Sequence, residues 1–242
     1  MTKKQFLKEN WFYIAILVVS VPTIVINRLL NGFDSIVWVM DLGSFFSALY
    51  VVFTAKHTIW GIICDLVASI FLAIGTIAQH VWLNASICIF ISIPLLTVGV
   101  FRWRKNEEKA KSKDETNLFE LTKKSKISLF LIYFLISVAL GIVLFFLNSN
   151  VFYLDAFYSV GCAIGVVLSS RAYLDQFYVF MIADIFGLVM YTVLTAQNIN
   201  NLSMIITEIV FTVGNFKALI EWKKLQKKNM LKGLEVKENV VG

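Results

Sequence analysis

The segment from Ile127 to Leu147, ISLFLIYFLISVALGIVLFFL, has 21 residues and contains no ionisable carboxylate or base. About 20 such residues cross the hydrocarbon core of a bilayer as an α-helix, which satisfies its backbone hydrogen bonds internally. The whole chain is 58% hydrophobic and 16% charged, with a mean hydropathy of +0.76. Ordinary soluble domains are roughly 45–50% apolar and 25% charged. The sequence therefore predicts an all-α polytopic membrane protein.

Apolar runs of similar length predict about eight transmembrane helices. Their expected ranges are 11–29, 36–54, 58–78, 82–101, 127–147, 154–170, 174–196 and 200–221. The start of the chain is basic, as in a signal peptide. However, it has no convincing small-residue cleavage site and stays apolar as far as Ile26, so we expect the first helix to be retained.

The basic residues predict the orientation of the chain. Eight spans place both termini on one side, and 21 of the 22 Lys and Arg residues then fall on that side, with Arg28 as the exception. Basic residues concentrate on the cytoplasmic side of membranes. We therefore expect a multi-pass protein of the plasma membrane with cytoplasmic termini. Its net charge of +6 suits anionic lipid headgroups, and no nucleic-acid partner is expected.

The sequence lacks the residue patterns that disulfide frameworks, metal sites and common catalytic sites require. The cysteines, Cys64, Cys88 and Cys162, lie in apolar segments without paired spacing, so neither a disulfide framework nor a metal site is indicated. The two histidines, His57 and His80, lie at the ends of segments. The sequence contains no nucleotide-binding glycine loop and no nucleophile elbow. We expect no cofactor, no metal and no enzymatic activity.

Two stretches of the chain resemble each other and predict an internal repeat. Each contains an acid in its first helix, a basic turn, an acid in its second helix, an Ala-Gln pair and an aromatic-basic stop. These residues are Asp41, Lys56, Asp65, Ala78-Gln79 and Trp103-Arg104-Lys105 in the first copy, and Asp155, Arg171, Asp184, Ala196-Gln197 and Trp222-Lys223-Lys224 in the second. From the second acid to the tryptophan, the interval is 38 residues in both copies.

Each copy has three helices, and a single helix between them gives both copies the same orientation. A parallel repeat of this kind places a binding site near the membrane midplane, where the halves meet. The expected organisation is an N-terminal extra helix (1–34), a first three-helix bundle (35–105), a basic cytoplasmic loop with a linker helix (106–152), a second three-helix bundle (153–224) and a cytoplasmic tail (225–242).

The 3+1+3 arrangement, the tryptophan-basic stops and the aromatic-x-x-aromatic pair in RAYLDQFYVF resemble the Pnu family of bacterial vitamin transporters. The resemblance covers about residues 35 to 225. It implies a fold similar to that of the SWEET sugar transporters and facilitated uptake of nicotinamide riboside, thiamin, riboflavin or deoxynucleosides. Family members that take nicotinamide riboside resemble one another in a W-x-x-W motif, where this chain has Phe177 and Phe180. They also tend to have asparagine at the position of Asp184.

Phe177, Phe180 and Asp184 share one helical face because they are spaced i, i+3 and i+7. An ionised carboxylate at mid-membrane costs about 2.5–3.5 kcal/mol, so such residues generally face a cavity or a partner. We expect Asp184 to accept hydrogen bonds from a ligand and the two phenylalanines to stack on its ring. The alternatives are an interhelical bond for Asp184 and simple packing for the phenylalanines.

Four further residues are candidates for substrate binding. Trp60 and Asp65 are the counterparts in the first repeat, and for Asp65 a cytoplasm-facing gate or salt bridge is an equal alternative. Glu208 and Asn215 share a face of the last helix, where they would contact the ligand or bond to another helix. Close helix approach is also expected in the second repeat, at Gly187 and Gly214.

These features lead to the hypothesis of a facilitator that carries nicotinamide riboside down its gradient by alternating access. The resemblance implies that cytosolic phosphorylation traps the product. A deoxynucleoside, favoured by the two phenylalanines, and thiamin are alternative substrates. Proton coupling through Asp65, Asp184 and Glu208 is an alternative mechanism, and a membrane-embedded sensor or enzyme is the alternative class. The oligomeric state stays open, a homo-oligomer included.

Overall fold

A computed structural model of the chain describes residues 11, 14–16, 18–26, 29, 35–56, 58–78, 81–113, 119–147, 149, 151–197 and 202–241. These residues form helices joined by short turns, together with one isolated β-bridge between Phe119 and Tyr173. The first expected span, 11–29, lies partly outside the described residues. The prediction of an all-α chain is confirmed.

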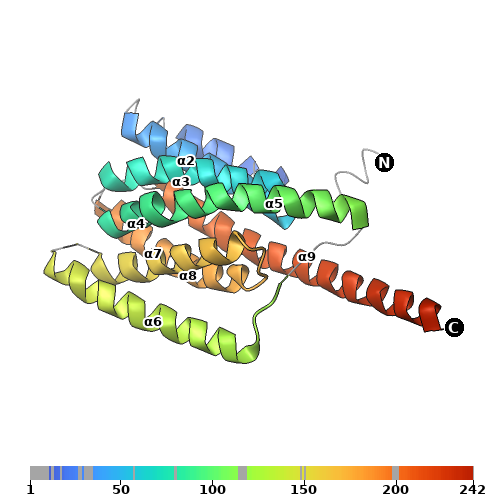
Figure 1. Ribbon diagram of the computed structural model, residues 1–242. Helices are drawn as coiled ribbons and strands as arrows, with labels where there is room; N and C mark the ends of the chain where they lie inside the picture. Colours follow the sequence, from blue (N-terminus) through green and yellow to red (C-terminus); the bar gives the residue numbers. More distant parts are fainter. Residues whose placement is uncertain are drawn as a thin grey trace.

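From the second span onward, the helices begin within four residues of the expected positions, but the spans expected to end at residues 101 and 221 continue as helix to Lys113 and Val241. The helices are α2 (Ser35–Ala55), α3 (Ile59–Ala78), α4 (Trp82–Ile87), the π-helical turn η1 (Cys88–Ser92), α5 (Ile93–Lys113), α6 (Lys123–Phe146), α7 (Phe152–Ser169), α8 (Gln176–Gln197) and α9 (Leu202–Val241). Among the described residues, 6 segments are long and apolar enough to cross a membrane, and one of them joins α4, η1 and the first part of α5. The last helix, α9, has 40 residues, and its C-terminal part extends beyond the bundle (Figure 1).

The helices pack as two groups of three spans. In the first unit, α2 packs on α3, which packs on the continuous α4–η1–α5 span; in the second unit, α7 packs on α8, and α8 packs on α9. The linker helix α6 packs on α7 at the edge of the bundle (Figure 1). The units meet through α2 with α9 and through α7 with α4–η1–α5. The first helix of each unit therefore contacts the last helix of the other, as an approximate two-fold relation requires.

Two indole hydrogen bonds repeat this reciprocal arrangement at the level of single residues. Trp222 Nε1 donates to the carbonyl oxygen of Thr54 over 2.9 Å, and Trp103 Nε1 donates to that of Ser169 over 3.0 Å. Thr54 lies at the end of α2, and Ser169 is the last residue of α7. Both tryptophans are buried, and their ring centroids are 6.0 Å apart. We call Trp103 and Trp222 the crossed tryptophan pair.

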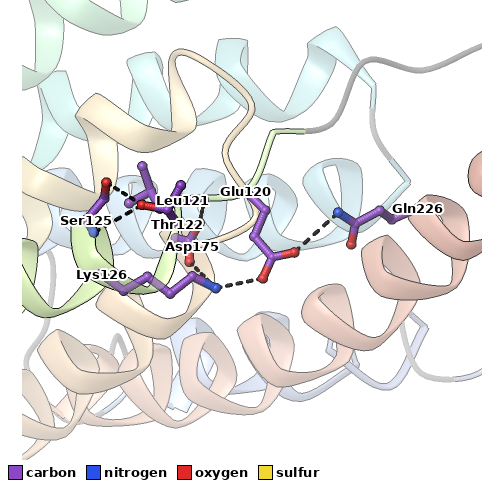
Figure 2. A network of polar contacts seen from close by, with 7 residues as sticks. All are labelled: Glu120, Leu121, Thr122, Ser125, Lys126, Asp175 and Gln226. Carbon is purple, nitrogen blue, oxygen red and sulfur yellow. Dashed lines mark hydrogen bonds and ion pairs between the residues drawn. The ribbon is translucent and has the colours of Figure 1, made fainter.

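Beside this pair, the segment that precedes α6 is fixed to the turn between α7 and α8. The Asp175 carboxylate accepts the backbone N–H of Leu121 over 2.7 Å and pairs with Lys126 at 3.0 Å. Lys126 also donates to Glu120 over 2.6 Å, and Gln226 of α9 donates to the other oxygen of Glu120 over 3.3 Å (Figure 2). This connector network holds three distant parts of the chain together.

The two glycines expected to permit close helix approach do so. A Cβ atom at Gly214 of α9 would overlap Cγ1 of Val51 on α2. A Cβ atom at Gly187 of α8 would lie 2.6 Å from the Tyr158 ring of α7. Gly214 therefore sets the spacing between the two units, and Gly187 sets the spacing inside the second unit.

Gly214→Ala should destabilise the protein by about 1–3 kcal/mol, because the added methyl group forces α2 and α9 apart. The matched control is Gly99→Ala in α5, where the nearest atom to a new Cβ is 3.4 Å away, an ordinary contact. In that helix, alanine is intrinsically better than glycine by roughly 0.5–1 kcal/mol. The midpoint of unfolding in mixed micelles with increasing sodium dodecyl sulfate measures both effects. Equal losses in the two variants would contradict this account of the interface.

Candidate functional site

A small cavity lies where the two units meet, and both units supply its walls. Its volume is about 70 Å³. The first unit contributes Ser47, Tyr50, Asp65, Ser69, Leu72, Asn84, Cys88 and Ser92, and the second contributes Tyr158, Cys162, Val166, Phe180, Asp184, Phe211 and Asn215. Hydroxyl, amide and carboxyl groups are thus concentrated at this point within otherwise apolar helices.

Asp184 lies in the cavity wall and is also bonded to a neighbouring helix. Its Oδ2 atom accepts a hydrogen bond of 2.9 Å from Nδ2 of Asn215, which joins α8 to α9. Both side chains are buried. The interhelical bond considered from the sequence is therefore present, and the same two side chains line the cavity. This bond fixes the carboxyl group in place, so that a ligand would meet an acceptor that is already oriented.

Asp65 of α3 is the corresponding acid from the first unit, and it also lines the cavity. Its Oδ2 atom is buried and has no hydrogen-bond partner among the described residues. Buried polar atoms are nearly always satisfied, and exceptions commonly mark a site for water or a ligand. The cavity therefore contains the Asp184 carboxyl group, which is bonded to an amide, and the Asp65 carboxyl group, which has an oxygen available to accept a hydrogen bond from a ligand.

The two phenylalanines of the expected stacking face lie in different surroundings. Phe180 lines the cavity, edge-on to Tyr50 with ring centroids 6.3 Å apart. Phe177 is fully buried, and its ring packs edge-on to Trp222 at 4.9 Å. Three residues advance a helix by about 4.5 Å, which places Phe177 at the level of the crossed tryptophan pair. Of these two phenylalanines, only Phe180 can offer its ring to a ligand in the cavity.

Trp60 does not reach the cavity. Its side chain is 58% exposed on the surface of α3, whereas Asp65 in the same helix faces inward. Each residue turns an α-helix by roughly 100°, so the five-residue interval from Trp60 to Asp65 separates the two side chains by about 140°. The four-residue interval from Phe180 to Asp184 separates them by only about 40°. The extra residue in the first repeat is the reason for the difference.

Glu208 is buried, does not line the cavity itself and is joined to the cavity wall by a tyrosine. The Tyr158 hydroxyl donates to Oε1 of Glu208 over 2.9 Å, which joins α7 to α9. The Tyr158 ring also lies edge-on to Tyr191 at 5.9 Å. The other carboxyl oxygen, Oε2, has no hydrogen-bond partner among the described residues. Tyr158 lies in the cavity wall, so a change at Glu208 would be transmitted to it.

Most of the neutral polar groups in the wall are not predicted from the sequence. Tyr50, Asn84, Tyr158 and three serines all line the cavity. Asn84 could have been found, because an amide inside an apolar helix needs a partner just as a carboxylate does. Serine and tyrosine give no such signal, since a hydroxyl can bond to a backbone carbonyl of its own helix, as Ser86 does with Trp82.

Comparison with known proteins identifies the family. A family model described as "Nicotinamide mononucleotide transporter" matches residues 37–224. The chain belongs to this family. A solved structure, "Crystal structure of the Vitamin B3 transporter PnuC", superposes with a TM-score of 0.66 at 20% identity, covering 88% of this chain and 92% of that chain. No curated protein sequence matches the chain.

Membership in this family confirms the resemblance and establishes a transporter rather than an enzyme. The structural similarity confirms a polytopic membrane fold. At 20% identity, the superposition shows the fold alone. The roles of individual side chains in the cavity stay predictions.

Tyr158→Phe should destabilise the protein by about 1–3 kcal/mol, because it leaves the buried Glu208 carboxyl without its hydrogen-bond donor. The phenyl ring would keep the contact with Tyr191. Tyr153→Phe is the matched control, since Tyr153 lies on the same helix with its side chain 48% exposed. Unfolding of both variants in mixed micelles tests the difference. A Tyr158→Phe variant as stable as the parent would show that the buried bond contributes nothing.

Proposed function

We propose that this chain carries out facilitated uptake of nicotinamide riboside across the bacterial plasma membrane, with both termini in the cytoplasm. The observation that carries the proposal is the polar cavity between two equivalent units, with one carboxyl group from the second helix of each, Asp65 and Asp184. Membership in a family of nicotinamide mononucleotide transporters and structural similarity to a vitamin B3 transporter support the substrate class.

The cavity wall has the groups that a ribosylated ring requires. The carboxylates of Asp65 and Asp184 accept hydrogen bonds from ribose hydroxyls, and the amides of Asn84 and Asn215 can donate to or accept from a carboxamide. Phe180 supplies a flat surface for the ring, and stacking of this kind contributes about 1–3 kcal/mol per base in other proteins. Ligand sites generally combine such apolar walls with a few fixed polar groups.

The size of the cavity indicates that substrate binding requires movement of the two units. Pockets for small ligands are typically about 300–1,000 Å³, whereas this cavity is about 70 Å³. Its present volume accommodates only a few water molecules. Rocking of one unit against the other around a central site would enlarge it and open it alternately to each side. The crossed tryptophan pair lies toward the end that carries most basic residues, which we assign to the cytoplasm.

The sequence contains no ATP-binding motif, so transport should run down the substrate gradient, and phosphorylation by a cytosolic kinase should trap the product. Purified protein in kinase-free liposomes should equilibrate radiolabelled nicotinamide riboside without concentrating it, and an uncoupler should change nothing. An enclosed nicotinamide riboside kinase with ATP should produce accumulation. Accumulation without the kinase that collapses with an uncoupler would instead establish proton coupling.

Variants of the cavity wall test the binding residues. Asp184→Ala should lower the rate of nicotinamide riboside uptake at low substrate concentration by about tenfold, equivalent to ~1.4 kcal/mol. Asp184→Asn should restore much of that rate, because the amide oxygen still accepts a hydrogen bond. Phe180→Ala should also lower uptake, through the loss of ring stacking.

Ile185→Ala is the matched control for these variants, since Ile185 follows Asp184 directly and is exposed on the outer face of α8. Uptake of thymidine and of thiamin should be measured in parallel. If one of them is transported in place of nicotinamide riboside and shows the same pattern of losses, the site is retained and the substrate assignment is replaced. Full activity of both Asp184→Ala and Phe180→Ala would reject the site.

A further inference from the structure

We propose that a second pocket, at the basic end of the molecule, binds a phosphate-bearing anion that bridges the two units. This pocket has a volume of about 340 Å³, within the range of small-ligand sites. It is lined by Arg102, Lys105, Phe119, Ser170, Arg171 and Tyr173. We call it the basic pocket. It is separate from the central cavity, because the two share no lining residue.

The basic pocket brings together cations from both units. Arg102 and Lys105 lie on α5 of the first unit, whereas Arg171 lies in the turn between α7 and α8 of the second. None of the three forms an ion pair or side-chain hydrogen bond with any residue whose side chain the structure describes. Three positive charges around one hollow repel one another, and a bound anion would relieve this repulsion.

Two carboxylates close to the pocket in the chain, whose side chains the structure describes, are already engaged elsewhere. Glu120 and Asp175, which lie close to the pocket residues Phe119 and Tyr173 in the sequence, both bind Lys126 (Figure 2). The hydrogen bond from Lys126 lowers the pKa of Glu120, so that this carboxyl is ionised and compensated at neutral pH. Neither of these two acids is therefore available to neutralise Arg171.

The walls of the basic pocket are held by backbone contacts. Leu174 N–H donates to the carbonyl oxygen of Phe119 over 2.8 Å, and the rings of Phe119 and Tyr173 lie 5.7 Å apart. Ala172, between Arg171 and Tyr173, has a φ of 58° and turns the chain sharply. The Trp103 bond to Ser169 holds α5 against the same turn. The backbone that carries Arg171 is therefore held in place, so a ligand would have to order the cationic side chains but not the chain that bears them.

The two repeats provide an internal comparison. Counted from the tryptophan of each stop, Arg102 corresponds to Glu221 and Lys105 corresponds to Lys224. Glu221 forms an ion pair of 3.0 Å with Lys217 in its own helix. The second unit therefore has an acid where the first has an arginine of the pocket. A bias of basic residues toward one membrane face does not require this convergence, so the basic pocket is a specific feature of one interface.

The chemistry of the three cations favours phosphate. An arginine guanidinium matches phosphate oxygens with two parallel hydrogen bonds, and a lysine adds a compact charge. Two sources supply such a group at a membrane surface: the headgroup of an anionic phospholipid or a soluble phosphate monoester. A phosphate that contacts both Arg102 and Arg171 would link α5 to the α7–α8 turn, and so would reinforce the contact made by Trp103.

The test is thermal unfolding of the full chain in lipid nanodiscs, which does not depend on transport. One set contains phosphatidylcholine alone, and a second contains added phosphatidylglycerol. A third, of phosphatidylcholine alone, receives glycerol 3-phosphate, with sodium chloride at equal ionic strength as its reference. We expect phosphatidylglycerol or glycerol 3-phosphate to raise the unfolding temperature by several degrees. Stabilisation by the lipid alone identifies a headgroup site, and stabilisation by the soluble ester identifies a metabolite site.

Arg102→Gln and Arg171→Gln should each remove this shift while leaving the unfolding temperature in phosphatidylcholine close to that of the parent. Lys224→Gln is the control for loss of charge, because it removes one positive charge from the second unit at the position that corresponds to Lys105, and it should keep the shift. The proposal is overturned if neither additive stabilises the parent beyond the salt reference. It is also overturned if Lys224→Gln abolishes the shift as completely as the two arginine variants do.

Discussion

The structure depends on one kind of contact made twice, between the first helix of each unit and the last helix of the other. The final carbonyl groups of an α-helix have no partner within that helix, and inside a membrane an unpaired polar group is costly. Thr54 and Ser169 lie at the ends of α2 and α7, and each carbonyl receives an indole N–H from the opposite unit. Each of these hydrogen bonds thereby satisfies a carbonyl group at a helix end and a buried indole N–H, and it also joins the two units.

The central cavity follows from this reciprocal packing, because the polar side chains of both units face the surface that they share. The two carboxyl groups of the cavity differ in their hydrogen bonding because the two repeats differ at one position. Asn215 lies seven residues before Trp222 and donates to Asp184, whereas the residue seven positions before Trp103 is Leu96, which is fully buried. Leucine cannot donate a hydrogen bond to Asp65. Divergence of the two repeats at one position thus leaves one carboxyl oxygen available in the cavity.

The same comparison of the two repeats distinguishes the basic pocket from the general positive charge of that face. The units share tryptophans and basic turns, yet the residue before the tryptophan is an arginine in one and a glutamate in the other. Equivalent backbones with different charges produce a pocket of converging cations in one place and a local ion pair in the other. The asymmetry of the central cavity and the cations of the basic pocket both arise where the repeats differ.

The sequence alone determined the helical spans, the repeat and the acids at its core, because apolar length, periodicity and rare charges in a membrane are local properties. It also identified Trp103 and Trp222 as matching ends of the two repeats, and Gly214 as a site of close helix approach. Only the tertiary structure decided which side chains face the cavity. Phe180 and Phe177 look alike in the sequence, yet one turn of helix separates a ring beside the cavity from one packed on Trp222. Pairing is equally non-local: Asp184 and Asn215 are 31 residues apart in the chain, and only packing of α8 on α9 brings them together.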